Sequence, residues 1–263
     1  MNINFYKYEG AGNDFIILDN RNQKFSTYLK ADIIKKMCDR HFGIGADGLM
    51  ALQLKEGYDF EMSYFNANGN EGTMCGNGGR CMVSLAERLG MINGETTFLA
   101  VDGPHYAKIS EKSGWVRLKM IDVNHIDFDG DAFVLDTGSP HYVLRTSGLR
   151  IKDVFKEGRE IRYNETYSKT GINVNFVEDT GSFFNVRTYE RGVENETYAC
   201  GTGVTAVAMA MAKYKNKTGY IQTALRVKGG ELNVSFNYDG QCFTEVFLEG
   251  PATFVFTGAF ITG

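Results

Sequence analysis

Short apolar or alternating segments make up most of this chain. Clear examples are Phe15–Leu18, Phe60–Tyr64, Trp115–Met120 and Glu245–Leu248. Runs of this length, rich in branched and aromatic residues and separated by Gly, Asn and Asp, are typical of β-strands. The chain has 31 Gly but only 3 Pro to form its turns. The pattern therefore predicts a strand-rich fold.

Three longer segments have helical periodicity instead. The predicted helices run from Lys30 to Arg40, from just after Cys75 to Leu89, and from just after Cys200 to Tyr214. Gly90 follows the second helix, where a glycine commonly ends a helix. The third helix is apolar on nearly every side between Val204 and Ala212. A helix of that kind is normally buried all round, so we expect a sheet curled around it.

The two later helices begin with the same nine-residue frame. Asn70–Gly78 and Asn195–Gly203 both read N-E-x-x-x-C-G-x-G, and they are 125 residues apart. Two copies do not make a solenoid. They predict an α+β fold of two pseudo-symmetric domains, each a strand-rich, barrel-like sheet around a central helix. We expect the first domain over residues 1–115, with the tail 251–263 returning to it, and the second over residues 116–250.

Composition and net charge argue against a protein that binds nucleic acids or anionic membranes. The 263 residues include 43% hydrophobic and 23% charged residues, with a net charge of -4. This balance gives no reason to expect a nucleic acid or an anionic membrane as partner. The start of the chain lacks a basic leader followed by an apolar run, so we predict a cytoplasmic protein.

The five cysteines do not suggest a disulfide framework or a metal site. Their number is odd, no C-x-x-C pair occurs, and no Cys/His cluster has zinc spacing. Cys38, Cys81 and Cys242 lie outside the repeated frame, and we interpret them as core thiols. Gly43–Gly48 fits G-x-G-x-x-G, but a helical segment precedes it and no long helix follows, unlike a dinucleotide site.

A cysteine at the start of a helix has unusual chemistry. The first backbone N–H groups of a helix have no partner within the helix, so they can bind an anion, and glycine lets a ligand approach them. The same position favours the thiolate form of the cysteine. The helix dipole alone contributes at most about 2 kcal/mol, so direct N–H···S bonds must supply any larger effect. One such cysteine is usually structural, but two in the same frame indicate a function.

Two such cysteines facing one cleft suit the inversion of a stereocentre. One sulfur removes a proton from one face of a carbon, and the other delivers a proton to the opposite face. One must start as thiolate and the other as thiol, so the pair is expected to titrate as a coupled unit. N–H groups of both helices would hold the substrate carboxylate, where negative charge develops. Arg191 suits a second carboxylate, and Glu190 and His141 suit an ammonium group.

Further motifs carry a resemblance to a known family along the whole chain. The chain resembles the diaminopimelate epimerases through Gly10–Phe15, Arg40–Gly48, Phe65–Gly69, Cys75–Cys81, Pro140–His141, Tyr189–Gly192 and Ala199–Gly203. The resemblance implies interconversion of LL- and meso-diaminopimelate for lysine and peptidoglycan synthesis, without cofactor or metal. It also implies two similar domains, each a barrel around a central helix.

The resemblance assigns roles to particular residues. Cys75 and Cys200 would be the catalytic base and acid, with His141 and Glu190 beside the reaction centre. N–H groups of Gly76, Asn77, Gly201 and Thr202 would hold the reacting carboxylate. The distal end of the substrate would be bound by Asn13, Asn66, Asn173 and Arg191. The expected partners are a small amino-acid substrate and a second copy of the chain in a homodimer, but no nucleic acid and no membrane.

Two positions depart from the family pattern and keep other substrates open. Gly48 stands where some members carry Gln, and Ser139 stands where many carry Asn. One alternative is a two-cysteine racemase for proline, glutamate or histidine. A second is an isomerase of the phenazine-biosynthesis type, although that type generally uses a carboxylate instead of paired cysteines. A third is a redox sensor in which Cys75 and Cys200 form a disulfide.

Overall fold

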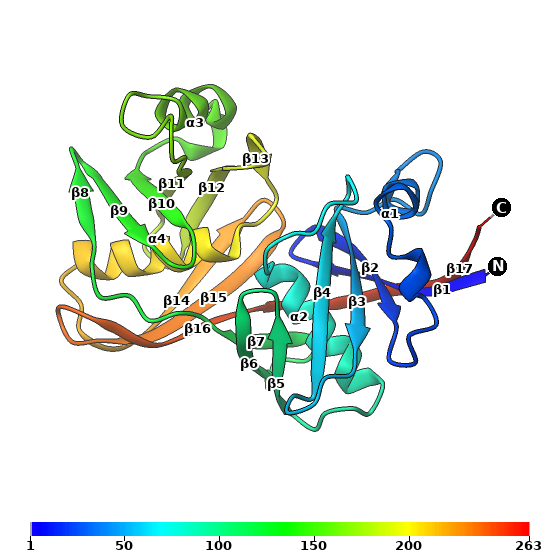
Figure 1. Cartoon of the computed structure of the whole chain (residues 1–263). Helices are drawn as coiled ribbons and strands as arrows, with labels where there is room; N and C mark the ends of the chain where they lie inside the picture. The colour runs from blue at the N-terminus through cyan, green and yellow to red at the C-terminus, as the bar shows by residue number, and fades with distance from the viewer. Residues whose placement is uncertain (1, 263) are drawn as a thin grey trace. The chain divides into compact units, whose positions relative to one another are not determined.

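The computed structural model of the chain describes residues 2–262. Contacts divide the chain into two compact units. The first unit contains the residues up to Leu118 together with the segment from Gly250 onward, and the second contains Lys119–Glu249. Each unit has its own row of paired strands and its own central helix (Figure 1).

The sheet of the first unit consists of eight strands in a row. Their spatial order is β17 (Thr253–Ile261), β1 (Asn2–Gly10), β2 (Asn13–Asp19), β3 (Gly48–Gln53), β4 (Phe60–Asn66), β5 (Glu95–Ala100), β6 (Gly103–Ile109) and β7 (Trp115–Lys119). The pairs β2–β3 and β4–β5 are parallel, and the others are antiparallel. Strand β17 therefore completes the edge beside β1, at the opposite end of the chain (Figure 1).

Helix α2 (Gly76–Arg88) packs against this sheet and contacts strands as distant in the row as β17, β1, β3 and β6. Most of its residues are buried, including a run from Asn77 to Val83. Gly90 follows the helix in the left-handed region, with φ 67°. The backbone N–H of Met91 donates to the carbonyl of Ala86, so Gly90 ends the helix as expected.

The second unit repeats the connectivity of the first. Its strands lie in the order β8 (Asp127–Asp129), β9 (Ala132–Asp136), β10 (Pro140–Arg145), β11 (Asn173–Asp179), β12 (Phe184–Glu190), β14 (Gly219–Val227), β15 (Gly230–Tyr238) and β16 (Phe243–Pro251). The parallel pairs β10–β11 and β12–β14 occupy the places of β2–β3 and β4–β5. The short strand β13 (Asn195–Thr197) pairs with the end of β12.

Helix α4 (Gly201–Tyr214) is the central helix of the second unit. Every residue from Gly203 to Ala212 is buried, which confirms the prediction made from its apolar sequence. It packs against β9, β10, β11, β12, β14 and β15 (Figure 1). The structure thus confirms the predicted α+β class with a sheet around a central helix.

Each unit has one further helix in the same place. Helix α1 (Ala31–Cys38) lies between β2 and β3 in the chain, and α3 (Val154–Arg162) lies between β10 and β11. The sequence pattern did not predict α3, because only Val154 and Gly158 of this charged segment are buried. Asp153 accepts from the backbone N–H of Lys156 and caps it. Short 3₁₀ turns occur at Ser26–Tyr28 and Leu149–Ile151.

No helix within residues 2–262 is long and apolar enough to cross a membrane.

Candidate active site

Cys75 lies at the start of the central helix of the first unit. It is the N-cap of α2, with an extended backbone at φ -107° and ψ 118°, and it is partly buried. The next residues turn into the helix, so the N–H groups of its first turn are not used in helical hydrogen bonds. The Cys75 thiol donates to the side-chain oxygen of Asn13, with Sγ and Oδ1 3.7 Å apart. Asn13 and Cys75 are thus brought together, although they are far apart in sequence.

Cys200 has the matching position in the second unit. It is the N-cap of α4, with φ -120° and ψ 110°, and only 7% of it is exposed. Its Sγ lies 3.5 Å from the hydroxyl of Thr202, which can donate to it or accept from it. Gly203 packs tightly behind the cysteine, because a Cβ built there would lie 3.3 Å from Sγ of Cys200. Both predicted cysteines therefore start a central helix, each beside a polar side chain.

His141 is fully buried on β10 behind this site. Burial, reinforced by the positive charge of Arg191, lowers the pKa of His141 to about 3. The side-chain amide of Asn175 lies 3.1 Å from Nδ1, and the Oδ1 of that amide accepts from Thr188. Nδ1 must then accept from Asn175, so the proton of the neutral ring lies on Nε2. Nε2 has no hydrogen-bond partner within the described chain, so His141 offers one free buried donor.

The buried His141 should make the protein sensitive to acid. Its folded pKa is lower than the ordinary value, so stability is complete above about pH 6.5 and falls as the pH drops toward 3. For this shift the loss between pH 7 and pH 4 is about 3 kcal/mol. We expect His141→Gln to lose less stability than the parent over that interval in urea denaturation. Equal losses in the two proteins would show that His141 does not titrate on unfolding.

Arg191, Asn173 and Ser139 form a polar cluster close to His141, whose strand partner is Asn173. The Asn173 amide donates to Ser139 Oγ at 2.8 Å and accepts from the backbone N–H of Arg191 at 2.9 Å. The exposed guanidinium of Arg191 donates to the same Ser139 hydroxyl at 3.2 Å. Ser139, noted only as a departure from the family pattern, therefore contacts two of the predicted binding residues.

Glu190 and Asn66 lie at the ends of corresponding strands. Glu190 ends β12, and burial raises its pKa above the ordinary value. Asn66 ends β4, and its backbone N–H donates to the carbonyl of Asn70. Within residues 2–262, Asn66 and Asn13 are not hydrogen-bonded to each other. Strand β3 lies between β2, which begins with Asn13, and β4, which ends with Asn66.

The structure explains why Gly48 departs from the pattern. A Cβ built on Gly48 would lie 2.5 Å from the ring of Tyr64 and 2.7 Å from the carbonyl of Phe65. Tyr64 therefore fills the space that a longer side chain would need. A Gln at this position requires a different residue or conformation at position 64.

The other three cysteines differ among themselves. Cys38 and Cys81 are buried, as predicted, and burial raises the pKa of Cys38 to about 11 and that of Cys81 further still. The prediction is wrong for Cys242, which lies only partly buried just before β16. No three His, Cys, Asp or Glu side chains in the described chain are grouped to hold a metal ion.

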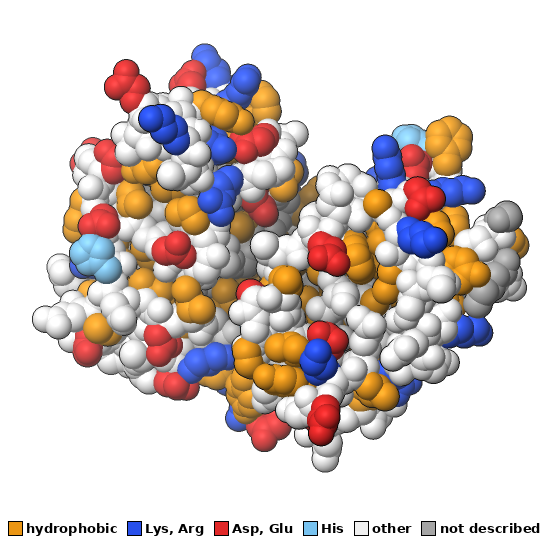
Figure 2. Space-filling view, in the orientation of Figure 1, with side chains coloured by type: hydrophobic (Ala, Val, Ile, Leu, Met, Phe, Trp, Pro, Cys, Tyr) orange, Lys and Arg blue, Asp and Glu red, His pale blue; other side chains and the backbone are white. Residues whose placement is uncertain are grey.

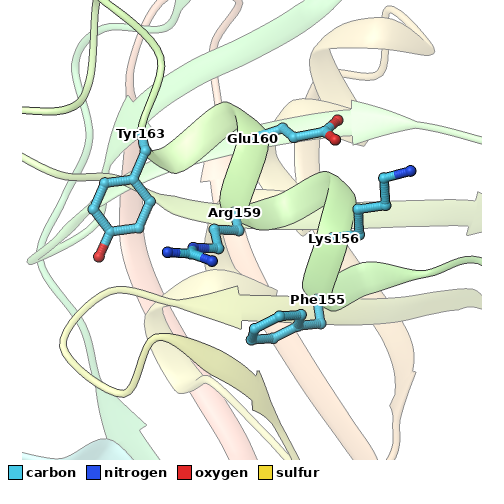
Figure 3. Close-up of a pocket in the computed structure, with 5 residues that line it drawn as sticks. All are labelled: Phe155, Lys156, Arg159, Glu160 and Tyr163. Carbon is cyan, nitrogen blue, oxygen red and sulfur yellow. The ribbon is translucent and has the colours of Figure 1, made fainter.

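Charged side chains of both signs are mixed on one face of the protein, and a groove lies apart from the predicted site residues. On the face shown in Figure 2, Lys and Arg side chains are interspersed with Asp and Glu and form no continuous basic patch. A shallow groove along α3 is lined by Phe155, Lys156, Arg159, Glu160 and Tyr163 (Figure 3). None of the predicted site residues lines this groove.

Comparison with known proteins identifies close relatives. The family model for diaminopimelate epimerase matches residues 5–126 and 133–255. A diaminopimelate epimerase of Flavobacterium psychrophilum is 50% identical over 252 residues, covering 95% of this chain and 97% of the relative. One from Chlorobaculum tepidum is 42% identical over 260 residues, covering 95% and 98%.

Solved structures with the same fold are much more distant in sequence. A phenazine biosynthesis protein of the PhzF family from Bacillus anthracis superposes with a TM-score of 0.77 at 13% identity, covering all of both chains. A probable proline racemase from Agrobacterium radiobacter K84 gives a TM-score of 0.68 at 14% identity, covering 97% of this chain and 92% of the other. At these identities the likeness extends to the fold only.

Proposed function

Because the chain belongs to the diaminopimelate epimerase family, we propose that it interconverts LL- and meso-diaminopimelate by moving a proton at one stereocentre. The observation that carries this proposal is the duplicated frame, which starts the central helix of each unit with a cysteine at its N-cap. A reaction that removes a proton from one face of a carbon and returns one to the opposite face needs two acid–base groups, one on each face.

In the proposed mechanism the two thiols share one proton between them. A thiolate removes the α-proton, and the thiol of the other cysteine protonates the carbon from the opposite face. The roles exchange in the reverse direction. N–H groups of Gly76 and Asn77 and of Gly201 and Thr202 are suited to the substrate carboxylate, because helix N-termini favour negative charge. They would also stabilise the charge that develops as the proton leaves.

Further polar side chains suit a substrate with two amino-acid ends. We assign the distal end to Asn173 and Arg191, with Asn13 and Asn66 from the first unit. The guanidinium of Arg191 is exposed and suits a carboxylate. The neutral His141 can donate through Nε2 but cannot act as a cation, and Glu190 is suited to an ammonium group.

We further propose that the enzyme needs no cofactor or metal, that it works in the cytoplasm and that it forms a homodimer. The support for the first point is that two thiols and backbone N–H groups suffice for the proton transfers. The homodimer rests on the sequence expectation alone, and the sedimentation of the purified protein would test it.

Turnover in deuterated water tests the proposed reaction. With a chelator present and no added cofactor, we expect solvent deuterium to enter the inverted carbon of diaminopimelate. Proline, glutamate and histidine, assayed in parallel, should give no comparable exchange. Protein alkylated beforehand with iodoacetamide is the control and should be inactive. A protein that turned over only one of the other amino acids would be a racemase of different specificity.

A further inference from the structure

We propose that Asp47 is a positioning residue that acts through Asn13 to keep the proton on Cys75 in the free enzyme. The inference rests on the proposed function, in which Cys75 is one of the two acid–base groups. It starts from a chain of hydrogen bonds in the first unit that links Arg80, Asn77, Asn13 and Asp47.

The donors and acceptors in this series of hydrogen bonds are fixed at its Arg80 end. Arg80 is fully buried, and a guanidinium can only donate hydrogen bonds. It donates to Oδ1 of Asn77 at 2.9 Å, so the NH₂ group of Asn77 is on the other side of that amide. This NH₂ group donates to Oδ1 of Asn13 at 3.3 Å.

Asp47, at the other end of the series, fixes the same orientation of the Asn13 amide. An ionised carboxylate can only accept hydrogen bonds. Oδ2 of Asp47 accepts from the NH₂ group of Asn13 at 2.6 Å, and Oδ1 is paired with Arg40 at 2.7 Å. The Asn13 amide is therefore constrained from both sides, by a neighbour that donates and by a neighbour that accepts.

The consequence concerns the oxygen that faces Cys75. Oδ1 of Asn13 is 3.7 Å from Sγ and can accept the thiol proton, whereas a thiolate would face an oxygen lone pair. The Asn13 carbonyl therefore favours the thiol. Other groups near Cys75 act as well: Arg80 on the same helix favours the thiolate, while Cys81 on that helix opposes it when ionised. Glu9 on β1 acts on Arg80 and Cys81.

Within residues 2–262, the matching place in the second unit is arranged differently. Ser139 corresponds to Asn13, because each lies two residues before the residue that starts the parallel pairing, His141 in β10–β11 and Phe15 in β2–β3. Ser139 bonds to Asn173 and Arg191 instead. One side chain beside Cys200 is that of Thr202, whose hydroxyl can donate to a thiolate. The two thiols are therefore not equivalent: the free enzyme holds Cys75 as thiol and Cys200 as the first to ionise. In this protonation state the enzyme can remove the α-proton of the stereoisomer whose α-hydrogen faces Cys200.

The test measures the pH dependence of alkylation of each cysteine separately. Purified wild-type protein is treated with iodoacetamide between pH 5 and pH 10, and modification at each site is followed by mass spectrometry. The midpoint in pH, unlike the absolute rate, does not depend on how accessible each thiol is. We expect Cys200 to have the lower midpoint. A lower midpoint for Cys75 in the wild type would overturn the proposal without any variant.

Substitution of Asp47 tests its role directly. In Asp47→Asn, the introduced amide has one oxygen for three donors, the side chains of Arg40 and Asn13 and the backbone N–H of Asp14, so the Asn13 amide loses one of the two constraints that hold its oxygen toward Cys75. We expect Cys75 to be alkylated about three- to tenfold faster at neutral pH, because weakening one hydrogen bond to the thiol lowers its pKa by about 0.5 to 1. Cys200 should be unchanged, which provides an internal control.

Two further variants separate the effect of the Asn13 orientation from the effect of losing a negative charge. Asp14→Asn removes one negative charge from the same cluster and leaves the hydrogen bond between Asp47 and Asn13 in place. It should therefore change the pH midpoint of Cys75 alkylation less than Asp47→Asn does. Asp47→Glu keeps a carboxylate and should restore the wild-type midpoint. Equal shifts in Asp14→Asn and Asp47→Asn, or no restoration by Asp47→Glu, would overturn the proposal. Alkylation does not require turnover, so a failed substrate assignment would be recognised separately.

Discussion

Replacing either Cys75 or Cys200 with alanine is expected to reduce epimerisation by about 10³-fold or more. A positioned acid or base contributes roughly 10²–10⁴-fold, and inversion requires both groups in one turnover. The loss should appear in the turnover number, because neither thiol is assigned to the binding of the distal end. Each variant also keeps one cysteine, which is still suited to exchange the α-hydrogen of one stereoisomer with solvent.

The exchange reaction makes this prediction sharper than an activity loss alone. Incubation of LL- and meso-diaminopimelate in deuterated water, followed by mass spectrometry, should show exchange of opposite stereoisomers in the two variants. Cys242→Ser is the matched control, because Cys242 is partly buried and lies outside the repeated frame. Loss of activity in that control, or exchange of the same stereoisomer by both alanine variants, would contradict two thiols on opposite faces.

Adding one methyl group at Gly203 is expected to destabilise the protein by about 2 kcal/mol, whereas the same change at the equivalent Gly78 should have little effect. Alanine in a helix is favoured over glycine by about 1 kcal/mol, and overpacking a tight core costs about 1–3 kcal/mol. At Gly203 the new Cβ would lie 2.5 Å from Oδ1 of Asn175. That amide is fully buried and held by Thr188 and His141, so it cannot move aside.

Gly203 and Gly78 differ because the atoms that a new Cβ would contact differ in how easily they can move. At Gly78 the nearest atom is Sδ of Met50, 2.9 Å from the new Cβ. A methionine side chain adapts readily, so the helix preference and the packing cost nearly cancel. The free energy of unfolding from urea denaturation would measure both variants. Similar losses for Gly203→Ala and Gly78→Ala would show that Asn175 is not a rigid neighbour.

The repeated frame made the central helices and their cysteines predictable from sequence. Each frame lies next to a helix with a strong apolar pattern, so position, start and burial followed from local residues. Helix α3 did not follow, because it buries only Val154 and Gly158 against the sheet, too few positions to create a periodic signal.

The supporting polar residues were not predictable in the same way. Asn175 and Asp47 act through contacts with His141 and Asn13, each 34 residues away in sequence, and these depend on strand register. Asn175 does carry a weak signal, since it lies two residues after Asn173 on a strand whose other buried residues are all apolar. Asp47 has none, because one acidic residue in a glycine-rich loop is usual for a solvated turn.

Strand β17 has a consequence for biosynthesis, because its partner β1 is made first and β17 is made after all of the second unit. On the ribosome, Lys119–Glu249 can complete its sheet while the edge of β1 is still unpaired. An unpaired edge strand is a template for association with other chains. Nascent chains stalled before Thr253 should therefore aggregate, or recruit chaperones, through β1 rather than through their newest residues.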